Sequence, residues 1–291
     1  MEVSIIIPSH NEGVNLKNTL ESITKNTEFE DYEIVVVDDA STDNSTNFLK
    51  SDFKDVKLIK TNVNCSNKAR NIGAKNAIGD VLFFLDAHVF PLTKFWMEDL
   101  FNFVKKYEKS VCGPCISVYG SPEVKGYGFS VINTKLNIDW LPKKTEVPYE
   151  VPMIGSACLV TSAKNFRKIG QFNDNFLSWG YDDIEFCIRS WLMGYRIFVL
   201  PNVDVAHLFR SNLPYPVKNE DILYNLLITY ILHLKHSRMD KLVSDLSCEI
   251  NVNILFDLVR KNNILNLRKI SIKKRVHDDD WFFDKFGIKI N

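Results

Sequence analysis

Apolar runs and amphipathic stretches alternate along the first two hundred residues. The almost continuously apolar runs at 3–7, 33–37 and 81–85 predict strands buried on both faces of a sheet. Further strands are expected at 56–60, 157–161 and 195–200. Between them, apolar residues three and four positions apart predict helices, among them 67–77, 95–107 and 182–193. Strands that alternate with helices indicate an α/β fold with a mostly parallel sheet flanked by helices.

The pattern changes beyond residue 220. Residues 222–234 and 241–260 mix apolar and charged residues at helical spacing, and no strand pattern returns. We therefore expect a helical C-terminal appendage, and we divide the chain into a domain of residues 1–212 and an extension of residues 213–291.

Charge and hydropathy narrow the class of protein. The 291 residues include 36 basic and 36 acidic side chains, and this balance argues against a general nucleic-acid binder. No apolar run approaches the roughly 20 residues of a membrane span. Because a strand is predicted from residue 3, we expect no signal peptide. We expect a cytoplasmic enzyme whose six cysteines are thiols.

A carboxylate and an imidazole follow the apolar run 81–85. Residues two apart on a strand point to the same side, so Asp86 and His88 are expected to aim at one point. An oxygen ligand beside a nitrogen ligand suits a divalent cation such as Mn²⁺. The alternative is a carboxylate that caps the next turn beside a surface histidine.

Four motifs in the same order resemble a known family. They are residues 5–12 (Ile-Ile-Ile-Pro-Ser-His-Asn-Glu), 35–43 (Val-Val-Val-Asp-Asp-Ala-Ser-Thr-Asp), 68–74 (Lys-Ala-Arg-Asn-Ile-Gly-Ala) and 86–88 (Asp-Ala-His). Together they resemble a family-2-like nucleotide-sugar glycosyltransferase of the Rossmann-like GT-A fold. The resemblance covers roughly residues 3–210 and makes residues 1–212 the expected nucleotide-sugar-binding and catalytic domain.

The metal motif departs from the usual Asp-x-Asp of that family. Asp86-x-His88 is similar to the variant of the polypeptide N-acetylgalactosaminyltransferases, and residues 205–210 (Val-Ala-His-Leu-Phe-Arg) resemble their segment with a further histidine ligand. The resemblance thus implies His207 as the third ligand. A divalent ion would compensate the charge of a departing diphosphate. Two nitrogen ligands favour Mn²⁺, with Mg²⁺ as the alternative.

The resemblance also implies a UDP-sugar donor and its contacts. The expected nucleotide contacts at the first two strand ends are Pro8, Asn11, Glu12, Asp38 and Asp39. Acids there would accept hydrogen bonds from the ribose or the base. Lys68 and Arg70 resemble basic residues that face the base and phosphate, with a solvated helix face as the alternative. Helix capping is the alternative for residues 39–43.

Residues 178–185 (Ser-Trp-Gly-Tyr-Asp-Asp-Ile-Glu) resemble the Trp-Gly-Gly-Glu-Asp element of inverting GT-A enzymes, including β-1,4-galactosyltransferases. In that element the second acid is the catalytic base, which implies Asp183, with Asp182 beside it. The retaining polypeptide N-acetylgalactosaminyltransferases have asparagine at the matching position, so the carboxylate favours inversion. The helix start is expected to keep both acids ionised. Trp179 is expected to stack on a sugar ring or, alternatively, to lie in the core.

The small residues 155–157 (Gly-Ser-Ala) resemble a patch that admits the donor sugar. Residues 115–160 contain many Gly and Pro breaks and are expected to form an irregular substrate rim. Residues 112–115 (Cys-Gly-Pro-Cys) have thioredoxin-like spacing, but no helical pattern follows them. We expect buried thiols that flank a turn.

Together these features predict a metal-dependent hexosyltransferase that moves a hexose or N-acetylhexosamine from a UDP-sugar to an acceptor hydroxyl or thiol. We expect no nucleic-acid partner and no transmembrane segment. Two alternatives stay open: a retaining enzyme that acts on a peptide or protein, and a sugar-nucleotide-binding protein without turnover. A saccharide, a peptide and a small natural product are all allowed as acceptor, because fold does not fix substrate.

Overall fold

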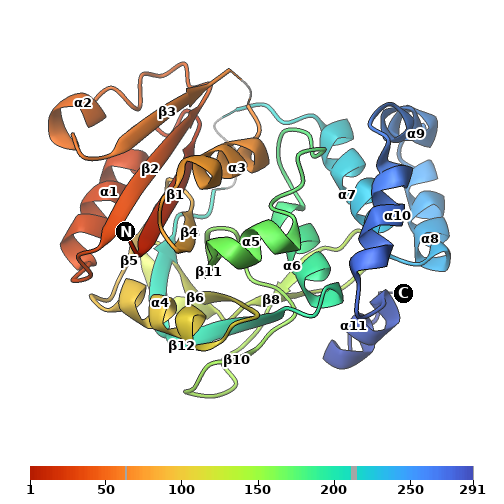
Figure 1. Cartoon of the computed structure of the whole chain (residues 1–291). Helices are drawn as coiled ribbons and strands as arrows, with labels where there is room; N and C mark the ends of the chain where they lie inside the picture. Colours follow the sequence, from red (N-terminus) through yellow and green to blue (C-terminus); the bar gives the residue numbers. More distant parts are fainter. Residues whose placement is uncertain (63, 211–214, 291) are drawn as a thin grey trace.

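The computed structural model describes residues 1–62, 64–210 and 215–290 and is built on a central sheet of ten strands (Figure 1). The main path runs β10-β12-β6-β11-β4-β1-β2-β3, with β5 paired to β12 and β7 paired to β6. These ten strands are β1 (Val3–Ser9), β2 (Tyr32–Asp39), β3 (Lys57–Thr61), β4 (Val81–Leu85), β5 (Val89–Pro91), β6 (Ser110–Val118), β7 (Ser121–Gly126), β10 (Tyr149–Glu150), β11 (Cys158–Ser162) and β12 (Arg196–His207).

The strands that carry the N-terminal motifs are parallel. β1 lies between β2 and β4 and is parallel to both, and β2 is parallel to β3. β11 is antiparallel to β4 and β6, while β12 is parallel to β6. The predicted α/β class, with a mostly parallel sheet flanked by helices, is therefore confirmed. A small second sheet pairs β8 (Phe129–Val131) with β9 (Ile138–Trp140).

Helices cover both faces of the sheet. Successive residues of a strand point to opposite faces, so Phe83 and Phe84 of β4 belong to two different hydrophobic clusters. The helices of the N-terminal part are α1 (Asn15–Asn26), α2 (Leu49–Asp52), α3 (Ser66–Asn76), α4 (Trp96–Lys106), α5 (Ala163–Ile169) and α6 (Asp182–Leu192). The short α5 was not predicted; Ser162 caps it, and Gly170 ends it with a φ of 108°.

Five helices form the C-terminal part, at the end of the molecule opposite β1–β3 (Figure 1). They are α7 (Asn219–His233), α8 (His236–Ser247), α9 (Val252–Lys261), α10 (Ile264–Lys274) and α11 (Asp279–Phe286). The helix predicted at 241–260 is thus two helices. α7 is buried from Leu223 to His233 and joins α6 in one hydrophobic cluster. The predicted boundary between residues 212 and 213 lies outside the described residues, so the two-domain division stays a prediction.

Two strands differ from the sequence prediction. Residues 110–118 form β6, whereas a turn at 112–115 and an irregular segment from 115 were expected. The strand predicted to end at Leu200 continues as β12 to His207. The two strands pair with each other, and their register shifts between Leu200 and Asp204, opposite Pro114 and Cys115. A bulge accommodates proline in a sheet. Among the described helices, none is long and apolar enough to cross a membrane.

Candidate active site

A cavity of about 540 Å³ opens where β1, β2 and β4 end. Open α/β sheets bind ligands at the carboxyl ends of their strands. The cavity walls come from the β1 and β4 ends, the start of α6, and the chain that follows β12. The predicted site residues that line it are Pro8, Glu12, Asp39, Arg70, Asp86, His88, Trp179, Asp182, Asp183 and His207.

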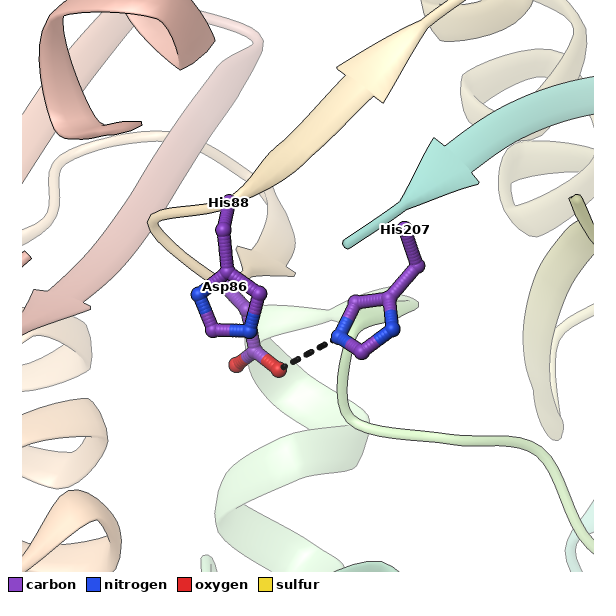
Figure 2. Close-up of side chains that lie close together, drawn as sticks. All are labelled: Asp86, His88 and His207. Carbon is purple, nitrogen blue, oxygen red and sulfur yellow. Dashed lines mark ion pairs between the residues drawn. The ribbon is translucent and has the colours of Figure 1, made fainter. Parts of the chain in front are cut away.

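Asp86, His88 and His207 form a compact group at the cavity wall (Figure 2). Each offers one ligand atom, and these atoms lie within 4.8 Å of one another. Asp86 and His88 come from the turn between β4 and β5, and His207 ends β12, as Figure 2 shows. Nε2 of His207 lies 3.8 Å from Oδ2 of Asp86, which is too long for a hydrogen bond. Two atoms at such a distance are free to share a cation.

The donor set fits a divalent transition ion. One carboxylate and two imidazoles suit Mn²⁺ better than Mg²⁺, which prefers oxygen. Among the described residues, the buried Nδ1 atoms of His88 and His207 both lack a hydrogen-bond partner. Each of the three side chains keeps between 14 and 22% of its surface exposed, so an ion from solvent can reach them.

Glu12 connects the two histidine segments. Its Oε1 lies 3.2 Å from Nδ1 of His88, and its carboxylate is ion-paired with the Arg210 guanidinium, three residues after His207. Burial raises the pKa of Glu12, but the contacts with His88 and Arg210 outweigh it and the pKa is lowered. Glu12 was predicted as a nucleotide contact; although it lines the cavity, its partners here are protein groups.

Arg70 connects the metal motif to the predicted catalytic acids. Its Nη2 donates to Oδ1 of Asp86 at 2.6 Å, and its Nη1 donates to Oδ2 of Asp182 at 2.9 Å. The Arg70 side chain is only 4% exposed, so this ion pair is shielded from solvent. Burial raises the pKa of Asp86, yet the charge of Arg70 and the contact with His207 outweigh burial and hold the pKa well below its usual range.

The start of α6 presents Asp182 and Asp183 to the cavity. Ser178, Gly180 and Tyr181 have φ values of 48°, 102° and 64°, which turn the chain sharply into the helix. Asp182 also accepts a hydrogen bond from Ser156 Oγ at 3.2 Å. Asp183 accepts one from the Ile184 amide at 2.8 Å.

The expectation that the helix start keeps both acids ionised is wrong for Asp183. Burial and the charge of Asp182 raise the pKa of Asp183 to about 7. Desolvation of the carboxylate therefore outweighs the helix dipole at this position. A carboxyl group with that pKa takes up and releases protons near neutral pH.

Three of the predicted nucleotide contacts lie outside the cavity lining. Asp38 accepts hydrogen bonds from the Ser41 amide and from Thr46 Oγ1, so it holds the loop after β2. The Oδ1 of Asn11 accepts from the Thr42 amide at 2.8 Å and joins the same loop. Lys68 is half-buried on α3 and is not part of the cavity wall. Asp39 does line the cavity, and it also accepts from the Cys65 amide at 2.8 Å.

Trp179 and the small residues 155–157 line the same cavity as Asp182 and Asp183. Trp179 is 43% exposed, so it is not a core tryptophan. It lines the cavity together with residues 155–157. A Cβ at Gly155 would lie 3.8 Å from Oδ2 of Asp183, which places residue 155 next to that oxygen.

Several cavity residues were not singled out from the sequence. The His10 ring nitrogen Nδ1 lies 2.6 Å from the Asp39 carbonyl oxygen, and the ring meets Tyr215 edge-on at 4.8 Å. On another wall, the Phe209 ring packs against His207 at 4.3 Å and against Trp140 at 5.9 Å. His10 lies in the motif at residues 5–12 and Phe209 in the segment 205–210, so their place in these motifs could have indicated that they reach the site. Nothing in the sequence near Tyr215 or Trp140 indicates that they reach the cavity.

Cys112 and Cys115 lie in β6 and do not flank a turn. Both are buried free thiols, as expected. Burial raises the pKa of Cys112 well above its usual value and that of Cys115 to about 12. A redox thiol needs a lowered pKa, so this pair is structural.

Comparisons with known proteins agree with this architecture. The model of glycosyl transferase family 2 matches residues 4–170, and that of the N-terminal domain of galactosyltransferase matches residues 141–211. A crystal structure of GalNAc-T7 with UDP, GalNAc and Mn²⁺ superposes with a TM-score of 0.77 at 21% identity and covers 99% of this chain and 56% of that one. The crystal structure of S. aureus TarS 1-349 in complex with UDP-GlcNAc superposes with a TM-score of 0.60 at 18% identity. It covers 100% of this chain and 93% of the TarS chain. The fold is therefore the GT-A fold of glycosyltransferases.

The family model covers more than half of the chain, and the chain belongs to glycosyl transferase family 2. It is also similar to polypeptide N-acetylgalactosaminyltransferase 3 of Drosophila melanogaster, with 28% identity over 237 residues (73% of this chain and 35% of the relative). Polypeptide N-acetylgalactosaminyltransferase 11 of Xenopus tropicalis is 28% identical over 269 residues, which are 82% of this chain and 43% of the relative. The chain thus spans less than half the length of these two curated relatives.

Proposed function

We propose that this chain is a metal-dependent glycosyltransferase that moves a hexose or N-acetylhexosamine from a UDP-sugar to an acceptor hydroxyl or thiol. One observation carries the proposal: the Asp86, His88 and His207 group and the carboxyl of Asp183 line the same cavity. The neighbours solved with UDP and Mn²⁺ and with UDP-GlcNAc support the choice of donor. In this proposal residues 1–212 carry the donor site, and Tyr215 and Ile222 add the start of the helical extension to its wall.

Asp86, His88 and His207 would hold the cation, with Mn²⁺ preferred over Mg²⁺. When bound, such an ion compensates negative charge on a leaving diphosphate. Arg70 keeps Asp86 ionised for ligation, and the Glu12 carboxylate lies 3.2 Å from the His88 ring. Pro8, Asp39 and His10 lie at the strand ends where the nucleoside is expected.

Asp183 is the proposed general base of an inverting transfer. Its carboxylate takes the proton of the acceptor while the acceptor atom forms a bond to the anomeric carbon. The bond from that carbon to the diphosphate oxygen breaks, and UDP leaves with the electron pair. Asp183 and Gly155 both line the cavity, so an acceptor in the cavity has access to the base. Asp182 is held by Arg70 and Ser156 and acts as a positioning residue for this turn.

A retaining transfer to a peptide or protein is the second candidate. It is favoured by the similarity to polypeptide N-acetylgalactosaminyltransferases, which extends over 73–82% of the chain in the two relatives above. In a retaining enzyme the acceptor attacks from the side of the leaving group, so Asp183 would not be required as a base. The two candidates share the donor site and differ in the anomeric configuration of the product.

The test combines nucleotide binding with product analysis. Titration calorimetry with UDP and a panel of UDP-sugars, with and without Mn²⁺, is expected to show Mn²⁺-dependent binding that is lost in Asp86→Ala. Asp80→Ala, which removes a carboxylate 76% exposed to solvent, is the matched control. Absence of nucleotide binding by the wild-type protein would reject the proposed function, and binding without metal dependence would reject the ligand set. Proton NMR of the product then decides between inversion and retention.

A further inference from the structure

Basic residues are concentrated in the outermost C-terminal helices. Residues 252–276 contain seven basic residues and one acidic residue, in a chain with 36 of each. The segment comprises α9, α10 and the residues just beyond. This asymmetry is local, since the remaining chain carries the compensating excess of acids.

Two of the seven cations have structural partners. Arg268 donates to the carbonyl oxygens of Ile231 and Leu234, and Arg275 donates to those of Leu232 and His233. These four carbonyls are at the end of α7, where a helix leaves its acceptors unsatisfied. Both arginines therefore bind α10 and the chain beyond it to α7 and are not available to an outside partner.

The lysines of the same segment point into solvent. Lys261, Lys269, Lys273 and Lys274 are exposed, and none forms an ion pair with a described residue. Of the cations in this segment, Arg260 alone is paired with an acid, the exposed Asp257 on the same helix. Unpaired lysines held close together on rigid helices create a positive local potential.

Aliphatic side chains are exposed between these lysines. Leu265 is 57% exposed and Ile272 is 47% exposed. Residues 265, 269, 272 and 273 have the spacing i, i+4, i+7 and i+8, so they lie along one stripe of α10. Of the eleven residues of α10, only Ile264 is buried, and the next exposed aliphatic, Val276, follows directly after the helix. The helix thus lies on the surface with leucine and isoleucine facing outward among lysines.

We propose that this surface, composed of Leu265, Lys269, Ile272 and Lys273 together with Lys274 and Val276 at the end of α10, docks the protein on an anionic membrane surface. Helices that lie in a membrane interface combine cations with aliphatic side chains that enter the boundary between headgroups and acyl chains. Lysines next to an anionic leaflet are attracted to it within about a Debye length. A nucleic acid would satisfy the lysines but offers no apolar phase to Leu265 and Ile272, and this favours lipid.

Vesicle co-sedimentation of the full chain tests the proposal. We expect binding to vesicles of phosphatidylcholine with about one-third phosphatidylglycerol and none to phosphatidylcholine alone. Raising the salt from about 0.1 M to about 1 M shortens the Debye length from about 10 Å to 3 Å and is expected to release the protein. The triple variant Lys269→Gln, Lys273→Gln, Lys274→Gln is expected to partition on the order of 100-fold more weakly.

Matched variants separate charge from apolar insertion. Lys25→Gln, Lys75→Gln and Lys164→Gln together remove the same charge from exposed positions on α1, α3 and α5, and are expected to retain vesicle binding. Leu265→Ser with Ile272→Ser is expected to weaken it about tenfold at unchanged charge. Equal losses in the two triple variants, or unchanged binding by the serine variant, would overturn the proposal. So would tighter binding to duplex DNA than to the anionic vesicles. None of these measurements depends on sugar transfer.

Discussion

Glu12 Oε1 lies 3.2 Å from His88 Nδ1, and the same carboxylate is ion-paired with Arg210. The carboxyl end of β1 thereby holds two segments that each supply a histidine to the candidate metal site. Histidines that bind metals generally donate their second ring N–H to a carboxylate or carbonyl, which fixes the ring orientation and the tautomer. At 3.2 Å the Glu12 carboxylate is within reach of His88 for that role.

Replacement of Glu12 is therefore expected to weaken metal binding. Loss of such a partner typically reduces metal affinity by about 10- to 100-fold. We expect Glu12→Gln to fall in this range for Mn²⁺, measured by electron paramagnetic resonance of the free ion. Glu28→Gln removes a surface carboxylate that pairs with Lys94 and is the control. A Glu12→Gln protein with wild-type Mn²⁺ affinity would contradict the role.

Arg70 is expected to contribute to stability as well as to the site. Arg70→Met leaves the half-buried Asp86 and the buried Asp182 without their cation. Removal of one partner from a buried ion pair costs about 3–5 kcal/mol. Urea unfolding should show a loss of this size, against little change for Arg167→Met on the exposed side of α5. In a double-mutant cycle, Asp182→Asn should cost less in the Arg70→Met background than in the wild type; additive effects would argue against their coupling.

Asp183→Asn separates binding from chemistry. The amide has nearly the same shape but does not take the acceptor proton, so turnover is expected to fall by about 10²- to 10⁴-fold. UDP-sugar affinity should stay near the wild-type value, because the substitution leaves the metal group untouched. Asp284→Asn on the exposed side of α11 is the control in the same transfer assay. Undiminished turnover would favour the retaining candidate.

A buried network is expected to make stability fall in acid. His233 Nε2 lies 2.6 Å from Glu185 Oε1, and burial lowers the pKa of His233 below its ordinary 6.5. As the pH falls below about 6.5, the unfolded chain binds a proton that the native histidine does not, so the free energy of unfolding falls by up to about 1.4 kcal/mol per pH unit.

Glu185 extends this effect to lower pH. Burial raises its pKa, but Arg189 and His233 outweigh burial and lower the pKa to about 2 from an ordinary 4.5. The contribution of Glu185 to the free energy of unfolding is therefore fully present above about pH 4.5 and is lost as the pH falls toward 2. Urea unfolding at a series of pH values should show both windows. His233→Gln should flatten the first, and His236→Gln, at an exposed position on α8, should not. A flat wild-type profile from pH 7 to pH 5 would contradict this assignment.

In the native protein, only the exposed cysteine is expected to react with a thiol reagent. Five of the six are buried, and only Cys248 is exposed. An aromatic disulfide reagent near pH 8 should label one thiol in the native protein and all six after denaturation. Cys248→Ser should abolish the native signal, whereas Cys112→Ser should not change it. Rapid native labelling of Cys112 would contradict its structural assignment.

The sequence by itself determined the elements and the chemistry at their ends. Runs such as 81–85 are buried on both faces, and parallel strands bring their carboxyl ends to one edge, so the pattern indicated that Asp86 and His88 aim at one point. The family resemblance then favoured a metal site over a turn cap. The helical C-terminal part and the buried thiols also followed from local composition. Asp183 was assigned by resemblance, and the structure places it in the cavity.

The tertiary structure alone decided which of these groups have partners. The ion pair of Glu12 with Arg210 joins residues 198 positions apart, and Arg70 reaches Asp182 across 112 positions. Side-chain patterns report local geometry, whereas such contacts depend on how the sheet and the loops pack. The bulge that carries β12 past Pro201 to His207 depends on its pairing with β6. Desolvation of Asp183 likewise arises from surrounding elements, and for this reason its raised pKa was not foreseen.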